Sequence, residues 1–147
     1  MKAVGHKYGY IGRGRDKNPA KGEASPILYN KFLWIPIFNQ IFWLSATPLK
    51  PSVCFNSDLP RIATVAIFHN KFQSHYQVML INTHFDLNQE CRERSVDVLL
   101  QMLTGIIDKY NVREIIMMGD LNCSFDNQAV KRLFDNLKFV LDNYNQR

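Results

Sequence analysis

The sequence predicts a layered α/β domain in which helices pack outside a sheet core. Strand-like runs fill the first half of the chain, and the clearest helix follows them at residues 89–110. A short strand at 115–118 and a second helix at 127–138 come next. Helices that follow a β-rich segment bury their apolar faces against the sheet. The 147 residues are enough for one such domain.

Four segments carry the strand signal. Residues 26–33 and 41–46 are rich in aromatic residues and isoleucine. The apolar stretch 32–44 is broken by a proline and two amides, which predicts two strands around a turn, and it is too short to span a bilayer. Residues 61–68 and 76–83 are apolar in their middles and are separated by polar residues. They predict a hairpin with both faces covered.

The helix at 89–110 is predicted by one continuous apolar stripe. Its apolar side chains recur with helical spacing, at Val96, Leu99, Leu100, Leu103, Ile107 and Tyr110. The segment 115–118 is apolar throughout and ends at Gly119. It is therefore predicted to be a buried strand.

The net charge of +5 lies at one end of the chain. Residues 1–22 hold six basic side chains and one acidic side chain, whereas the rest of the chain holds twelve of each. The glycines of residues 5–22 predict a loop-rich segment. An anionic partner would meet this segment first, and a solvated basic tail is an equal alternative. The balanced charge elsewhere disfavours a nucleic-acid-binding module.

The three cysteines are Cys54, Cys91 and Cys123. They are odd in number and widely spaced, so they predict neither a zinc site nor a disulfide framework. This pattern favours a reducing compartment such as the cytoplasm. The first residues show no apolar signal segment.

Two polar motifs follow buried strands. In Asn82-Thr83-His84-Phe85-Asp86, the two-residue period of a strand places Asn82 and His84 on the same side. A histidine there can bond a phosphate oxygen or move a proton, although a hydrogen-bonded structural histidine is the alternative. In Gly119-Asp120-Leu121-Asn122, the same period places Asp120 and Asn122 on one face.

The chemistry of these residue types suits phosphate esters. A carboxylate such as Asp120 can activate water or bind a hard cation, and an amide such as Asn122 can stabilise an oxyanion. Turn formation is the alternative for both. Arginine in a glycine-rich loop, as at Arg15, suits bidentate contact with phosphate. Glu23 can orient a histidine, and Arg61 can reach a phosphate from the start of its strand.

In their order, these motifs resemble the endonuclease/exonuclease/phosphatase (DNase I-like) superfamily. The matching segments are GRGRD (12–16), GEASPILYNK (22–31), FWLSATPLKPS (42–52), PRIATVAIF (60–68), NTHFD (82–86) and GDLN (119–122). Residues 1–147 resemble the central part of that domain only. The resemblance implies a four-layer α/β sandwich of two sheets with helices outside, here truncated at both ends.

The resemblance also implies a site. The implied catalytic residues are His84, Asp120, Asn122 and Glu23, and the implied phosphate-binding residues are Arg15, Arg61 and Asn82. His84 is implied to contact the scissile phosphate while Glu23 pairs with it. The implied cofactor is Mg²⁺ or Mn²⁺, with Asp120 as a ligand.

The implied function is metal-dependent hydrolysis of phosphodiester or phosphomonoester bonds in a nucleic acid, phospholipid or sugar phosphate. The family's metal-binding glutamate and its C-terminal S-D-H motif have no counterpart in residues 1–147. The alternative is therefore a non-catalytic remnant that keeps part of the phosphate-binding cleft. A protein completed by a second chain is a further possibility.

Overall fold

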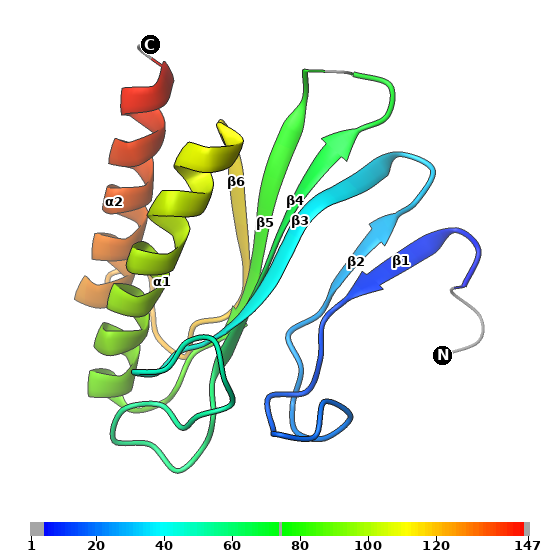
Figure 1. The fold of residues 1–147 in the computed structure, drawn as a ribbon. Helices are drawn as coiled ribbons and strands as arrows, with labels where there is room; N and C mark the ends of the chain where they lie inside the picture. The colour runs from blue at the N-terminus through cyan, green and yellow to red at the C-terminus, as the bar shows by residue number, and fades with distance from the viewer. Residues whose placement is uncertain (1–4, 74, 146–147) are drawn as a thin grey trace.

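The computed structural model describes residues 5–73 and 75–145, which form two sheets and two helices (Figure 1). The elements in chain order are β1 (Tyr8–Ile11), β2 (Ile27–Asn30), β3 (Trp34–Trp43), β4 (Ile62–Asn70), β5 (Gln77–His84), α1 (Gln89–Tyr110), β6 (Ile115–Asp120) and α2 (Gln128–Asn145). The larger sheet has the order β3-β4-β5-β6, and β1 pairs with β2 in a separate sheet. Among the strands of the described residues, only β5 and β6 pair in parallel.

The described residues form three layers. Helices α1 and α2 cover one face of the four-stranded sheet, and the β1–β2 pair lies on the other side (Figure 1). This is the layer order of the predicted α/β sandwich, in which the β1–β2 pair belongs to the second sheet. Within the described ranges, no helix has the length and apolar character needed to cross a membrane.

The main core lies between the helices and the sheet. Val65, Ile67 and Ile81 of the central strands pack against Leu99 and Leu103 of α1, and all five are fully buried. The predicted hairpin and the predicted apolar stripe are both confirmed. Helix α1 begins where the Asn88 side chain accepts a hydrogen bond from the Cys91 amide at 3.1 Å, as an N-cap does.

Two predictions for the first part of the chain are wrong: the turn within 32–44 and the loop at 5–22. The stretch 32–44 does not turn, because β3 runs without interruption from Trp34 to Trp43. Its proline is tolerated because β3 is an edge strand with a bulge between Pro36 and Phe38. Residues 5–22 also contain more than a loop, since strand β1 lies within them and pairs with β2.

Strand β6 is not buried, contrary to the prediction. Ile115 and Met117 pack on the core, but Ile116 is 45% exposed and Met118 is 38% exposed. The sequence pattern could not reveal this because β6 is the edge strand of its sheet, and the helices cover only one of its faces.

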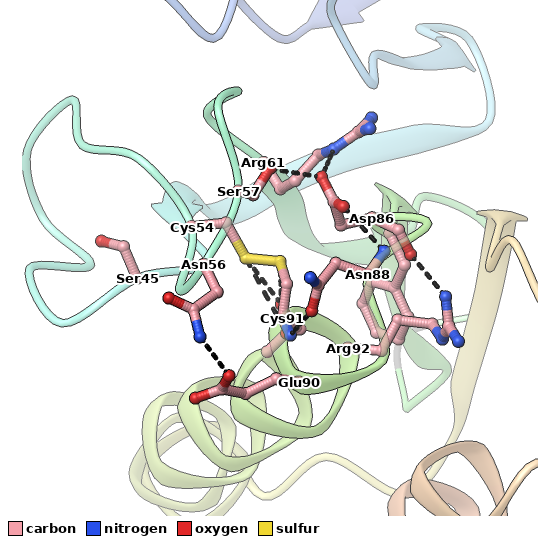
Figure 2. Close-up of a disulfide and its surroundings, with 12 residues drawn as sticks. Ser45, Cys54, Asn56, Ser57, Arg61, Asp86, Asn88, Glu90, Cys91 and Arg92 are labelled. Carbon is pink, nitrogen blue, oxygen red and sulfur yellow. Dashed lines mark hydrogen bonds and ion pairs between the residues drawn. A yellow bond between two sulfur atoms is a disulfide. The ribbon is translucent and has the colours of Figure 1, made fainter.

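A disulfide joins Cys54 to Cys91, so the prediction of unpaired cysteines is also wrong (Figure 2). The two residues are 37 positions apart, and their Cα atoms lie 5.9 Å from each other. Cys54 lies in the loop between β3 and β4, and Cys91 lies in the first turn of α1. The fold brings them together, and the argument for a reducing compartment therefore no longer holds.

We expect one reactive thiol, that of Cys123, when the protein is denatured without reductant, and three after reduction. A Cys54→Ser/Cys91→Ser variant should lose roughly 3–4 kcal/mol of unfolding free energy, because the closed loop no longer restricts the unfolded chain. Cys123→Ser is the matched control and should change stability little. Three reactive thiols before reduction would contradict the pairing.

Candidate active site

The site lies where β5 and β6 end side by side. In the parallel pair, His84 lies opposite Asp120. The amide of Phe85 continues the pairing by donating to the Asp120 carbonyl oxygen at 2.9 Å. Because parallel strands end at the same edge of a sheet, the two polar motifs of the sequence become neighbours.

Gly119 makes this close pairing possible. A Cβ atom at this position would lie 1.8 Å from the Thr83 carbonyl oxygen, and the backbone φ is +126°. The strand geometry ends at Asp120, whose Oδ1 accepts the Asn122 amide at 2.8 Å, and Asn122 has a left-handed φ of 50°. The prediction that Asp120 and Asn122 share one strand face is therefore wrong.

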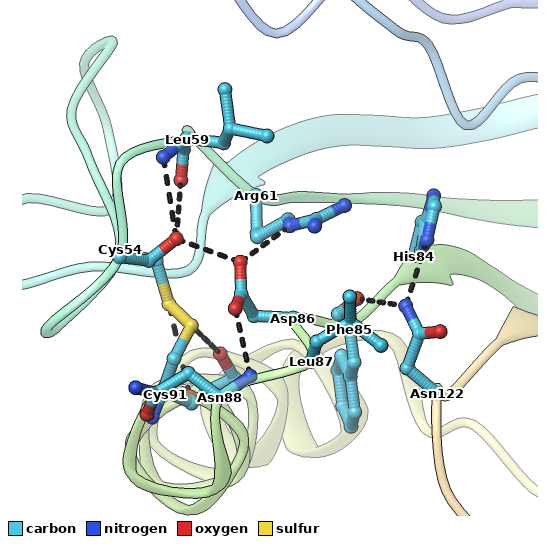
Figure 3. A network of polar contacts seen from close by, with 12 residues as sticks. Cys54, Leu59, Arg61, His84, Phe85, Asp86, Leu87, Asn88, Cys91 and Asn122 are labelled. Atoms are coloured by element: carbon cyan, nitrogen blue, oxygen red, sulfur yellow. Dashed lines mark hydrogen bonds and ion pairs between the residues drawn. A yellow bond between two sulfur atoms is a disulfide. The ribbon is translucent and has the colours of Figure 1, made fainter.

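Asn122 fixes the protonation pattern of the His84 ring. Its Nδ2 donates to the Phe85 carbonyl oxygen at 2.8 Å and lies 2.9 Å from His84 Nε2 (Figure 3). A carbonyl can only accept, so the nitrogen of the Asn122 amide has to face it. His84 Nε2 therefore accepts a hydrogen bond from the second N–H of the Asn122 amide. The proton of the neutral imidazole ring then lies on Nδ1.

Glu23 accepts a hydrogen bond from the His84 Nδ1–H group. Its Oε1 lies 2.8 Å from His84 Nδ1, and its Oε2 accepts a hydrogen bond from Arg15 Nη1 at 2.8 Å. Arg61 Nη1 lies 3.8 Å from the same Oε2. We call Glu23, His84, Arg15, Arg61 and Asn122 the polar cluster. Its members come from four separate segments of the chain.

The segment that carries Glu23 is anchored to β5. Asn82, on β5, donates from Nδ2 to the Pro26 carbonyl oxygen at 2.7 Å. Asn82 thus lies on the same side as His84, as predicted, and supports the segment that presents Glu23. Its predicted contact with phosphate stays a prediction.

The loop that carries Arg15 is closed on itself and tied to β3. The Arg15 amide donates to the Glu23 carbonyl oxygen at 3.0 Å, and Trp43 Nε1 donates to the Arg15 carbonyl oxygen at 2.8 Å. Gly14 allows the close turn, since a Cβ there would lie 1.8 Å from the Lys21 carbonyl oxygen. The glycine-rich basic segment is therefore an ordered loop that holds an arginine in place.

Asp86 ends the motif at 82–86, and the sequence alone predicted no role for it. It is 6% exposed, and its Oδ2 accepts from Arg61 Nε at 2.9 Å and from the Ser57 hydroxyl at 2.7 Å (Figure 2). Burial by itself raises the pKa of Asp86, but hydrogen bonds from the Asn88 amide, Ser57 and Arg61, with the charge of Arg61, outweigh it and hold the pKa below its usual value. Asp86 is therefore ionised near neutral pH.

The described residues do not form a metal site on their own. Across 5–73 and 75–145, no three His, Cys, Asp or Glu side chains are grouped so that they could hold a metal ion. Asp120 accepts the Asn122 amide through Oδ1 and can offer a cation at most its two carboxylate oxygens. A divalent cation usually takes several oxygen ligands, so Asp120 is not sufficient.

Solved structures resemble this chain across most of its length. A mannosyl-6-phosphatase of Bacteroides thetaiotaomicron VPI-5482 matches 88% of the chain with a TM-score of 0.82 and 29% sequence identity. An endonuclease/exonuclease/phosphatase protein of Bacteroides vulgatus matches 90% with a TM-score of 0.75 and 28% identity. The chain has the fold of the endonuclease/exonuclease/phosphatase superfamily.

The likeness extends to distant members of the superfamily. The catalytic domain of human Nocturnin, solved with a bound sulfate anion, matches 86% of the chain with a TM-score of 0.64 and 15% identity, which is a likeness of fold alone. The chain spans about half the length of these solved structures, between 47% and 49% for the three named here. No protein-family model and no curated protein sequence matches it.

Proposed function

We propose that the polar cluster binds the phosphate group of a phosphate ester, and that the domain to which these residues belong hydrolyses that ester. The convergence of Arg15, Arg61 and His84 on Glu23 carries the proposal. Two guanidinium groups and an oriented imidazole beside a strand-end carboxylate suit a phosphate better than a neutral ligand.

Each residue has a distinct role in the proposed reaction. Arg15 and Arg61 attract and hold the phosphate oxygens. Asp120 orients or deprotonates the water that attacks phosphorus from the side opposite the leaving group. When the phosphate binds, His84 Nε2 and the Asn122 amide give up their mutual hydrogen bond. The amide then donates to one phosphoryl oxygen and a protonated Nε2 donates to another, while Glu23 holds the His84 ring through Nδ1.

The cofactor follows from the resemblance. Mg²⁺ or Mn²⁺ would supply Lewis-acid stabilisation of the phosphoryl oxygens. Asp120 would contribute a ligand oxygen, although the described residues group no two further His, Cys, Asp or Glu side chains with it.

The substrate class is a phosphodiester or a phosphomonoester, and a sugar phosphate is one candidate. The similar Bacteroides thetaiotaomicron protein is described as a mannosyl-6-phosphatase. Nucleic acid and phospholipid are the other substrate classes of the superfamily.

The direct test is hydrolysis of bis-p-nitrophenyl phosphate and of mannose 6-phosphate by the purified protein, with and without Mg²⁺ or Mn²⁺. We expect turnover that requires the metal and is lost in Asp120→Ala. Asp135→Ala, an exposed carboxylate on α2, is the matched control and should keep full activity. Turnover that survives in Asp120→Ala would contradict the assigned role of Asp120.

A non-catalytic phosphate-binding remnant is the second candidate. Two observations favour it: the chain spans about half of the similar structures, and its described residues lack a three-ligand metal group. In this case the folded protein binds inorganic phosphate but hydrolyses neither ester in the presence of metal.

A further inference from the structure

Asp86 divides its two carboxylate oxygens between the backbone and Arg61. Oδ1 accepts the Asn88 amide at 2.8 Å, next to the start of α1. Oδ2 accepts Arg61 Nε at 2.9 Å and the Ser57 hydroxyl at 2.7 Å. The carboxylate is thus fixed on one side by the chain that leads into α1, and it holds the arginine on the other.

Arg61 is held through Nε, which leaves Nη1 and Nη2 of its guanidinium group able to bind a ligand. The residue is 7% exposed, and Asp86 binds the Nε atom at the root of its guanidinium group. Among the described residues, Nη1 and Nη2 make no hydrogen bond, although Nη1 lies 3.8 Å from Glu23 Oε2. In Figure 3 the guanidinium group extends from Asp86 toward the side where His84 lies. The two terminal nitrogens are the pair that a phosphate group can engage together.

We propose that Asp86 is a positioning residue for phosphate binding. It holds Arg61 through Nε, so that Nη1 and Nη2 face the other members of the polar cluster and bind two oxygens of the phosphate group. This inference rests on the proposed function, because it assigns Asp86 a role in the same phosphate site.

The energetics favour a clamp over a freely moving arginine. A buried guanidinium group without a partner would be costly, and an arginine with free torsions would lose conformational entropy when it binds phosphate. Asp86 supplies the buried counter-charge and fixes the plane of the group before the ligand arrives. Because Asp86 contacts only Nε, the ion pair leaves Nη1 and Nη2 of Arg61 available to bind phosphate.

The test is titration of the wild-type protein and its variants with inorganic phosphate by calorimetry. Asp86→Asn keeps the size of the side chain and can still accept the Asn88 amide, but its amide nitrogen cannot accept from Arg61. We expect phosphate affinity to fall about tenfold or more, as for the loss of a charge-assisted hydrogen bond. Ser57→Ala removes the other contact of Oδ2, leaves Arg61 clamped, and is expected to change affinity less than about threefold.

A double-variant cycle separates positioning from general stabilisation. Because Asp86 acts through Arg61, adding Asp86→Asn to Arg61→Ala should weaken phosphate binding no further than Arg61→Ala alone. Thermal melts of each variant check that it is folded. If Asp86→Asn does not fold, Asp86→Glu takes its place, because it keeps the charge but moves the carboxylate by one methylene and so displaces the Arg61 guanidinium group, and the same loss is expected.

The possible failures are distinguishable. Wild-type protein that does not bind phosphate would overturn the proposed phosphate site, and the role of Asp86 with it. Wild-type protein that binds, with equal affinity in folded Asp86→Asn, would overturn only the positioning role. A further loss when Asp86→Asn is added to Arg61→Ala would also overturn that role, since Asp86 would then act independently of Arg61.

Discussion

Gly119→Ala should destabilise the protein by roughly 3 kcal/mol or more, because the added methyl group has no space and the backbone conformation disfavours it. A Cβ atom would meet the Thr83 carbonyl oxygen at 1.8 Å, and the φ of +126° is one that side chains rarely adopt. The strand pair β5–β6 would have to separate at the point that aligns His84 with Asp120. Chemical denaturation measures the loss.

Gly105→Ala is the matched control for this substitution. Gly105 lies on the exposed side of α1, and a Cβ atom there would meet nothing within 4 Å. Alanine favours a helix more than glycine does, so this variant should gain roughly 0.5–1 kcal/mol. The same chemical change is thus expected to have opposite signs at the two positions. Equal effects would contradict the close approach of β6 to β5.

His84→Ala should lower the rate of phosphate-ester hydrolysis about a hundredfold or more, in any form of the protein with measurable turnover. The substitution removes the group that bridges Glu23 and Asn122, so both lose their contact with the imidazole ring. Glu23→Gln should cost about tenfold, because the neutral amide can still accept from Nδ1 but loses its charge pairing with Arg15.

His69→Ala is the matched control for the histidine substitution. His69 lies near the end of β4, opposite Gln77 at the start of β5, and is thus at the far end of the strands from His84. Turnover and stability should stay close to those of the wild type. A similar loss of rate in both variants would mean that the His84 effect is not specific to the site.

Sequence reasoning found the site because its polar residues follow apolar strands. His84 and Asp120 could be placed at strand ends from local pattern alone, and parallel pairing then made them neighbours. The contacts of Glu23 could not be derived in this way. It lies 61 positions from its partner His84, in a loop that is held by a hydrogen bond from the Trp43 indole to the Arg15 carbonyl oxygen. Only the family resemblance suggested that pair.

Two misses have the same physical origin. The Cys54–Cys91 disulfide and the Asp86–Arg61 pair join residues that are distant in sequence, and each forms only when the loop before β4 folds over the start of α1. The local sequence pattern does not predict such long-range contacts. The exposure of β6 was missed for a related reason, because a strand's position in the sheet is set by its neighbours.

The tautomer of the His84 ring tests the central claim most directly, since the arrangement of Glu23 and Asn122 dictates it. Long-range proton–nitrogen NMR spectra at alkaline pH, recorded before and after addition of inorganic phosphate, give the state of each ring nitrogen. We expect a proton on Nδ1 and a bare Nε2 before addition, and phosphate-induced shifts at His84 but not at His69. A proton on Nε2, or phosphate-induced shifts that bypass His84, would contradict it.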